Sequence, residues 1–196
     1  IGIPNPDARG GSLSSEPYLL EYLQSRENTK VTTIVYGSNG ERVPFWCRIL
    51  GTVKMCREML RIAGRENYDI IHINTAYNVN GLLRDVFIVL ALRFIGIKAK
   101  LFLKFHGSDV TLLSKKLSWK LTTLLLLRNV NGVGFLSKEE KNNFLVAYPG
   151  LKDKFYIVKN VVNSTRFEIK SDFRERHMIS RQKTVFLFIA RFIEGK

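Results

Sequence analysis

The fold is decided by residues 68–109, which read YDIIHINTAYNVNGLLRDVFIVLALRFIGIKAKLFLKFHGSD. Two largely apolar runs, 68–74 and 99–105, have the length and composition of buried strands. Between them, 81–94 is apolar over most of its length, which is typical of a buried helix. A strand, a helix and a second strand at this spacing predict two parallel strands joined by a helical crossover.

The same alternation extends towards both ends of the chain. The composition predicts further strands at 1–4, 31–36, 132–136 and 155–158, and further helices at 14–24, 45–65, 113–128 and 137–148. The last of these helices opens with Ser137-Lys-Glu-Glu140, which matches a capping box. Strands that alternate with helices in this way predict an α/β fold built on a doubly wound, mostly parallel sheet.

A further strand is predicted at 184–190, and Arg191-Phe-Ile-Glu-Gly-Lys196 follows it as a loop. A buried strand needs partners for both of its edges and both faces. We therefore expect an N-terminal domain at 1–163, an interdomain segment at 164–183, and the truncated start of a second domain at 184–196. The missing initiator Met leads us to expect that the N-terminus is also clipped.

The charge balance is strongly basic. The 196 residues include 31 Lys and Arg against 17 Asp and Glu, a net charge of +14 at pH 7. Such a balance suits nucleic acid, an anionic membrane surface or phosphate-bearing substrates. Cys47 and Cys56 form neither a metal-binding spacing nor a disulfide framework, and no signal peptide is recognised, so the cytoplasm is the expected location. The longest apolar run, 86–92, is far short of the ~20 residues that span a bilayer.

Ligands of a doubly wound sheet bind beyond the carboxyl ends of its strands, so the residues that follow each strand are the candidates. Gly10 and Gly11 follow the first strand. Adjacent glycines before a helix let backbone N–H groups approach a phosphate, although a tight turn would need them as well. The pattern is neither a Walker loop nor a dinucleotide-binding fingerprint, which argues against an NTPase or an NAD enzyme.

Histidine and the terminal cations provide the other candidates. His106 directly follows the fourth strand, where it would line a pocket or serve a structural role, and Asp109 is expected chiefly to cap the next helix. His72 is expected to pack in the core, and His177 to face solvent. Arg191 and Lys196 follow the predicted strand at 184–190 and could clamp a diphosphate; the alternative is two surface charges.

In their order along the chain, these segments resemble the retaining family 4 glycosyltransferases. The resemblance rests on the Gly10-Gly11 loop, the third strand at 68–72 and the His106-Gly-Ser-Asp109 turn. In addition, 157–162 resembles the interdomain crossover of that family, and 189–196 resembles the first strand and loop of its second domain. The resemblance covers nearly the whole chain and implies the GT-B architecture, in which two Rossmann-like domains face each other across the active site.

The resemblance also implies roles for individual residues. Gly10 and Gly11 would face the donor diphosphate, His106 would be the catalytic-site contact to the transferred sugar, and Arg191 and Lys196 would neutralise the leaving group. The implied activity is retaining hexosyl transfer from a nucleotide sugar to a glycan or lipid-linked acceptor, in cell-envelope polysaccharide or glycolipid synthesis. No metal or other cofactor is implied.

The sequence departs from the family pattern in its crossover. That segment usually reads Asn-Gly-Val-Asp, whereas here it reads Asn160-Val-Val-Asn163. The paired glutamates of the family's second domain would lie beyond Lys196, so the residues that recognise the donor base cannot be assigned. We expect the fragment to be inactive alone, an expectation that sugar transfer by the 196-residue chain would overturn.

In this family the N-terminal domain selects the acceptor, which makes the amphipathic helix at 45–65 relevant. Its apolar face, which is expected to pack on the sheet, carries Ile49, Val53, Cys56, Leu60 and Ala63. The opposite face carries Lys54, Arg57, Arg61 and Arg65. We place these cations, together with Asn74, on the acceptor or membrane side. There they could attract anionic headgroups or a lipid-diphosphate acceptor and hold the protein on the cytoplasmic face of a membrane.

Two other classes stay open. A basic Rossmann-like module that binds nucleic acid without catalysis would explain the charge. However, aromatic residues are not interleaved with the cations and no nucleic-acid-binding motif is present, so nucleic acid is not the expected partner. A sugar-nucleotide epimerase of the GT-B architecture would share the fold and use other carboxylates and histidines.

Overall fold

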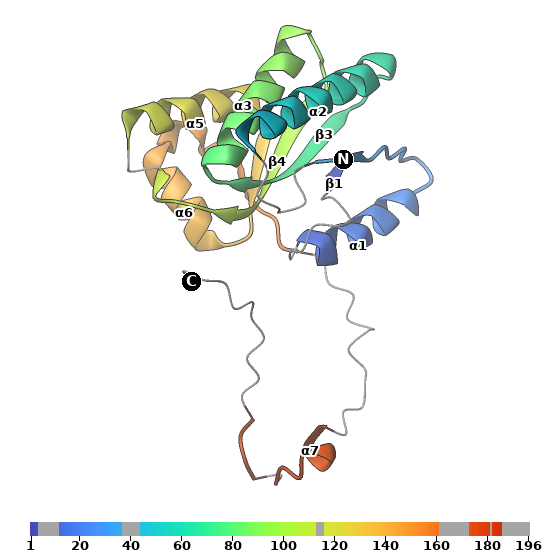
Figure 1. Cartoon of the computed structure of the whole chain (residues 1–196), viewed down its shortest axis with the longest axis vertical. Helices are drawn as coiled ribbons and strands as arrows, with labels where there is room; N and C mark the ends of the chain where they lie inside the picture. Colours follow the sequence, from blue (N-terminus) through green and yellow to red (C-terminus); the bar gives the residue numbers. More distant parts are fainter. Residues whose placement is uncertain (4–11, 37–43, 113–115, 161–172, 181, 186–196) are drawn as a thin grey trace. The chain divides into compact units, whose positions relative to one another are not determined.

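The computed structural model describes residues 1–3, 12–36, 44–112, 116–160, 173–180 and 182–185 (Figure 1). The chain divides into two compact units, Ile1–Val162 and Asn163–Lys196. In the second unit, the described residues form one short helix, α7 (Phe173–Arg176). The predicted strand at 184–190 lies outside the described residues except for its first two positions, which have no regular structure.

The first unit is a parallel sheet flanked by helices. Its strands are β1 (Gly2–Ile3), β2 (Ile34–Val35), β3 (Ile70–Tyr77), β4 (Lys100–Ser108), β5 (Gly132–Phe135) and β6 (Phe155–Ile157). Its helices are α1 (Ser12–Gln24), α2 (Phe45–Arg65), α3 (Val79–Phe94), α5 (Leu117–Asn129) and α6 (Lys138–Ala147), with a 3₁₀ helix at Pro149–Lys154. The strand order is β2-β1-β3-β4-β5-β6 and every pairing is parallel. The predicted α/β class is confirmed, and the arrangement is compatible with a Rossmann-like fold.

The two faces of the sheet differ in chemistry. In the register between β3 and β4, Ile73 pairs with Leu103, whereas the next residue, Asn74, pairs with Lys104. Successive side chains of a strand point to opposite faces, so one face is mainly apolar and the other carries Asn74 and Lys104. The apolar face and the helices on it, α2, α3, α5 and α6, share one continuous core. Figure 1 shows α2, α3 and α5 gathered on one side of the sheet and α1 on the other.

Helix α2 has the bounds that the sequence predicts, but its apolar face is only half covered. Cys56 and Met59 are buried, and Leu60 and Ala63 pack against the core. Residues 44–51 are all exposed, so the prediction that the whole apolar face packs on the sheet is wrong. A helix of 21 residues is about 32 Å long, whereas β1 and β2 are described over two residues each, a length too short to underlie the whole helix.

The predicted capping box is present at α6, with one change. The Ser137 hydroxyl oxygen accepts a hydrogen bond from the Glu140 backbone N–H at 3.1 Å. The Glu140 carboxylate accepts from the backbone N–H of Leu136 at 3.2 Å, one residue earlier than the simplest form of the motif. The first contact satisfies an N–H of the first helical turn, and the second satisfies an N–H just before the helix.

Within the described residues, no helix is long and apolar enough to cross a membrane.

Candidate functional site

The carboxyl end of β4 is irregular. Thr75 of β3 pairs with Phe105, but Tyr77 pairs with Ser108, so β4 carries one extra residue opposite β3. Such a bulge turns the strand locally, and bulges are common beside active sites. His106 lies at this bulge, within the last residues of the strand, whereas the sequence predicted that the strand would end at Phe105.

Beside the bulge, four side chains form a connected group, here called the Glu16 cluster: Glu16 of α1, Asn74 of β3, and Lys104 and His106 of β4. Lys104 Nζ lies 3.1 Å and His106 Nε2 lies 3.2 Å from Glu16 Oε1. Asn74 Nδ2 donates to Glu16 Oε2 at 2.9 Å and to the carbonyl of Gly2 at 2.7 Å. His106 Nε2 is also 3.1 Å from Asn74 Oδ1. The cluster therefore joins α1 to three neighbouring strands.

The cluster contains an ion pair that is almost completely removed from water. The side chains of Lys104 and Glu16 are 3% and 2% exposed. Burial alone would raise the pKa of Glu16. The hydrogen bond from His106 and the positive charge of Lys104 outweigh that effect, and the pKa is lowered from its ordinary value of 4.5. Glu16 is therefore a carboxylate at neutral pH.

The cluster fixes the orientation and the tautomer of His106. Its Nε2 faces two acceptors, the amide oxygen of Asn74 and the carboxylate of Glu16. A ring nitrogen between two acceptors must carry the proton, so Nε2 is the donor. Among the described residues, Nδ1 has no hydrogen-bond partner. In the neutral ring, Nδ1 is then an acceptor with no partner in the described part of the chain, held in place by the contacts that Nε2 makes on the other side.

His106, near the carboxyl end of β4, brings the cluster close to the position in the sheet where a ligand is expected. From β1 the chain passes to β2 on one side and then crosses to β3 on the other. Ligands of open α/β sheets bind outside the carboxyl ends of the strands at such a reversal. Asn74 of β3 bonds to Gly2 of β1, so the cluster lies across these two strands.

Two buried polar atoms of the described residues lack a hydrogen-bond partner, and both are close in sequence to the cluster. They are Oγ of Ser108, two residues after His106, and Nε2 of His72, two residues before Asn74. A buried polar atom without a partner is uncommon in folded proteins and costs free energy. Ser108 thus leaves an unsatisfied hydroxyl at the carboxyl end of β4.

His72 packs against an aromatic ring, as the prediction of a core residue requires. Its ring meets that of Phe102 edge-on, with 5.4 Å between the centroids. Burial, the largest influence, lowers the pKa of His72 from 6.5 to about 4. The folded protein therefore resists the protonation that the unfolded chain accepts.

This difference predicts a stability loss in mild acid. Between pH 6.5 and about 4 the unfolded state binds one more proton at His72 than the folded state, so stability falls as the pH is lowered. At about pH 5 the loss should be about 2 kcal/mol relative to pH 7. The His72→Phe variant loses no hydrogen bond at Nε2. Its free energy of unfolding in urea, measured at pH 7 and at pH 5, should not show this loss. His177→Gln, at an exposed position, is the control and should keep the wild-type loss; an equal loss in His72→Phe would contradict the assignment.

A second polar network lies on the other face of β3. Asp85 of α3 accepts hydrogen bonds from the hydroxyls of Tyr36 and Thr75, each at 2.7 Å. Arg84 pairs with Asp85 at 2.9 Å and lies over the Tyr36 ring. Burial, followed by the charge of Asp85, raises the pKa of Tyr36. Each of these polar groups has a partner within the network. The network therefore ties the end of β2 and β3 to α3, and it offers no unpaired polar group among these residues to a ligand.

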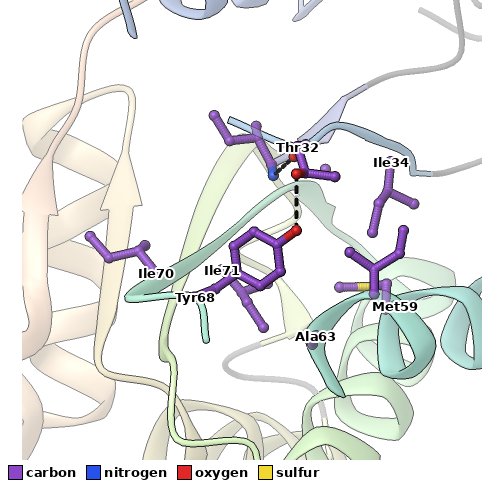
Figure 2. Close-up of a pocket in the computed structure, with 10 residues that line it drawn as sticks. Thr32, Ile34, Met59, Ala63, Tyr68, Ile70 and Ile71 are labelled. Carbon is purple, nitrogen blue, oxygen red and sulfur yellow. Dashed lines mark hydrogen bonds between the residues drawn. The ribbon is translucent and has the colours of Figure 1, made fainter. Parts of the chain in front are cut away.

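The small pocket drawn in Figure 2 lies at the opposite edge of the sheet, beside the first residues of β1, β2 and β3. Its volume is about 30 Å³ and its lining is mainly apolar, from residues such as Ile34, Met59 and Ile71. The Tyr68 hydroxyl donates to Thr32 Oγ1 at 2.9 Å within it. A space of this size holds about two water molecules, so the pocket is too small for a sugar or a phosphate.

The other predicted site residues are distributed as follows. Gly10, Gly11, Arg191 and Lys196 lie outside the described residues. The α2 cations are all exposed: Lys54, Arg57, Arg61 and Arg65. Asn74, predicted to lie on the acceptor side with them, is in the buried Glu16 cluster. Asp109 accepts a hydrogen bond from the backbone N–H of Thr111, so it orders the turn after β4. Leu112 is helical, the predicted helix start at 113 lies outside the described residues, and α5 begins at Leu117.

Sequence reasoning missed Glu16 and Lys104. The signal for Lys104 is visible in the run Leu101-Phe-Leu-Lys-Phe105, because a charged residue inside a buried strand requires a partner of opposite charge. Glu16 has no comparable signal, since it stands among polar residues at the start of a helix.

Comparison with protein-family models and with curated proteins found no match to this chain. Across the part of the chain that the structure describes, no group of three or more His, Cys, Asp or Glu side chains is placed to hold a metal ion.

Proposed function

We propose that the chain forms the acceptor-side half of a retaining glycosyltransferase of the GT-B type, which transfers a hexose from a nucleotide sugar to a glycan or lipid-linked acceptor. The observation that carries the proposal is His106 at the carboxyl edge of the sheet, with Nε2 held by Glu16 and Asn74 and Nδ1 unpartnered among the described residues. The family resemblance of the sequence supports the same function.

The proposed chemistry needs His106 as a fixed acceptor. A sugar hydroxyl can donate to Nδ1, and the carboxylate on the far side of the ring strengthens that acceptor. Lys104 neutralises Glu16, so the carboxylate adds no net negative charge beside a diphosphate donor.

The remaining parts of the proposed site come from the sequence. Backbone N–H groups at Gly10 and Gly11 would approach the diphosphate, and Arg191 and Lys196 would neutralise it as it leaves. A second Rossmann-like domain that begins at 184 would provide the donor-binding wall. In this arrangement the described unit contributes contacts to the sugar rather than to the base.

Saturation-transfer NMR on the 196-residue chain tests whether the chain contacts the sugar of the donor rather than its base. With UDP-glucose, GDP-mannose or ADP-glucose as ligand, we expect transfer to the sugar protons to exceed transfer to the base protons. The His106→Ala variant should lose the sugar signal while its urea midpoint stays near that of the wild type, because Glu16 keeps its partner Lys104. His177→Ala is the matched control. The proposal fails if none of the three ligands gives a signal, or if His106→Ala keeps it.

A GT-B epimerase is the second candidate, because a histidine oriented by a carboxylate can also act as a general base. Incubation with a nucleotide sugar distinguishes the two, since an epimerase changes the sugar without an acceptor, whereas a transferase needs one.

A further inference from the structure

The first half of α2 exposes large apolar side chains in a manner unusual for a water-facing helix. Phe45, Trp46 and Leu50 are 68%, 72% and 68% exposed. The two aromatic rings lie edge to face, with 5.7 Å between their centroids. Scattered apolar residues on a surface need no explanation, but a contiguous group marks a binding surface.

Helix α3 extends this surface. Leu83 and Phe87 are 50% and 47% exposed and, with Phe45, Ile49 and Val53 of α2, line a groove of about 300 Å³ between the two helices. Figure 1 shows α2 and α3 side by side. Both helices begin at the carboxyl edge of the sheet, where β2 and β3 end. The apolar surface therefore lies near the carboxyl edge of the sheet, close to which β4 carries His106.

Cations predominate beside this surface. Between residues 44 and 58 the chain carries Arg48, Lys54 and Arg57 against one acidic residue, Glu58. Arg48, Lys54 and Arg57 are exposed, and α2 continues with Arg61 and Arg65. The partner must therefore accept exposed aromatic and aliphatic side chains and provide negative charge beside them.

We propose that the α2–α3 surface, formed by Phe45, Trp46, Ile49, Leu50, Val53, Leu83 and Phe87, docks onto an anionic phospholipid bilayer. Aromatic side chains are favoured at the depth of the headgroups, and aliphatic side chains enter the acyl region below. The adjacent cations pair with anionic headgroups. The first half of α2 would lie in the interface, and the carboxyl edge of the sheet would then face a lipid-borne ligand.

Other occupants fit these observations less well. A second copy of the chain would bring two molecules of net charge +14 together through a surface rimmed by cations, which is unfavourable. A nucleic acid would satisfy the cations but would leave the aliphatic groove exposed. The bilayer is the partner that meets both requirements, and docking does not depend on sugar transfer.

Vesicle sedimentation tests the proposal in the absence of any nucleotide sugar. The chain should sediment with vesicles of equal parts phosphatidylglycerol and phosphatidylcholine, and much less with phosphatidylcholine alone. The Phe45→Ser variant should bind the anionic vesicles at least about tenfold more weakly, and Lys54→Gln about fivefold more weakly. Phe94→Ser is the matched control, because Phe94 is 93% exposed at the far end of α3 and should bind as the wild type does.

Leu50→Ser is a second variant at a position that is equally exposed, in case Phe45→Ser perturbs the helix as seen by circular dichroism. Sedimentation equilibrium of the wild type and of Phe45→Ser measures the oligomeric state independently of vesicle binding. The proposal is overturned by equal binding to neutral and anionic vesicles, by no binding, by wild-type binding of both serine variants, or by a dimer that Phe45→Ser dissociates. Failure of sugar binding at His106 would leave these results unchanged, so the two proposals are separable.

Discussion

Glu16→Ala should destabilise the protein by about 3–5 kcal/mol, because it leaves the ammonium of Lys104 buried without a carboxylate. The side chain of Lys104 is 3% exposed and its ion pair is with Glu16. The same substitution removes one of the two acceptors of Asn74 Nδ2 and one of the two acceptors of His106 Nε2. A loss of this size is a large part of the stability of an ordinary domain, and it should appear as a lowered midpoint in urea unfolding at pH 7.

Two further variants show whether the unpaired charge is the cause. Glu16→Ala combined with Lys104→Met removes both charges and should recover most of the lost stability, since apolar side chains can replace a buried ion pair. Glu66→Ala removes the partner of Lys30 in an exposed pair of similar length, 2.9 Å, and should cause no measurable change. A double variant as unstable as Glu16→Ala would show that the cost arises elsewhere.

The second large effect is expected from Gly81→Ala. A Cβ atom at Gly81 would lie 2.1 Å from the carbonyl oxygen of Ala76, a backbone atom that cannot rotate away. The Gly81 N–H also donates to Asn78 Oδ1 at 2.9 Å, which caps α3. Relieving the clash must move the start of α3 away from the end of β3. We expect a loss of about 3 kcal/mol or more in the free energy of unfolding.

Gly51→Ala is the control for that prediction. Gly51 lies in the middle of α2, and a Cβ atom at this position would meet nothing beyond the helix's own backbone within 4 Å. Alanine at an exposed helical site should stabilise by about 0.5–1 kcal/mol. The same substitution is therefore expected to act in opposite directions at the two glycines, and a Gly81→Ala protein as stable as the wild type would refute the packing described at the end of β3.

The order of the elements could be predicted because it depends on local patterns. The bounds of α2 and the Ser137 cap of α6 follow from residues within one segment. The Glu16 cluster could not be predicted in the same way. It depends on the register that sets Asn74 beside Lys104, and on α1 lying over that face so that Glu16 reaches both. These relations join residues far apart in the chain.

The exposure of the first half of α2 could not be predicted for a different reason. Helical periodicity correctly places Ile49 and Val53 on the same side as Cys56, but it says nothing of how far the sheet extends beneath them. Periodicity gives a direction for each side chain, and only the lengths of the neighbouring strands decide which of those side chains are covered. The uncovered ones form the surface that we assign to the membrane.

The central claim is that His106 presents Nδ1 as an acceptor to a sugar while Glu16 holds Nε2. Long-range ¹H–¹⁵N NMR of the imidazole nitrogens measures this directly. At a pH where the ring is neutral, we predict a protonated Nε2, an unprotonated Nδ1, and a change in the Nδ1 shift on addition of a nucleotide sugar. A proton on Nδ1 in the free protein, or an Nδ1 shift unchanged by UDP-glucose, GDP-mannose and ADP-glucose, would contradict the account.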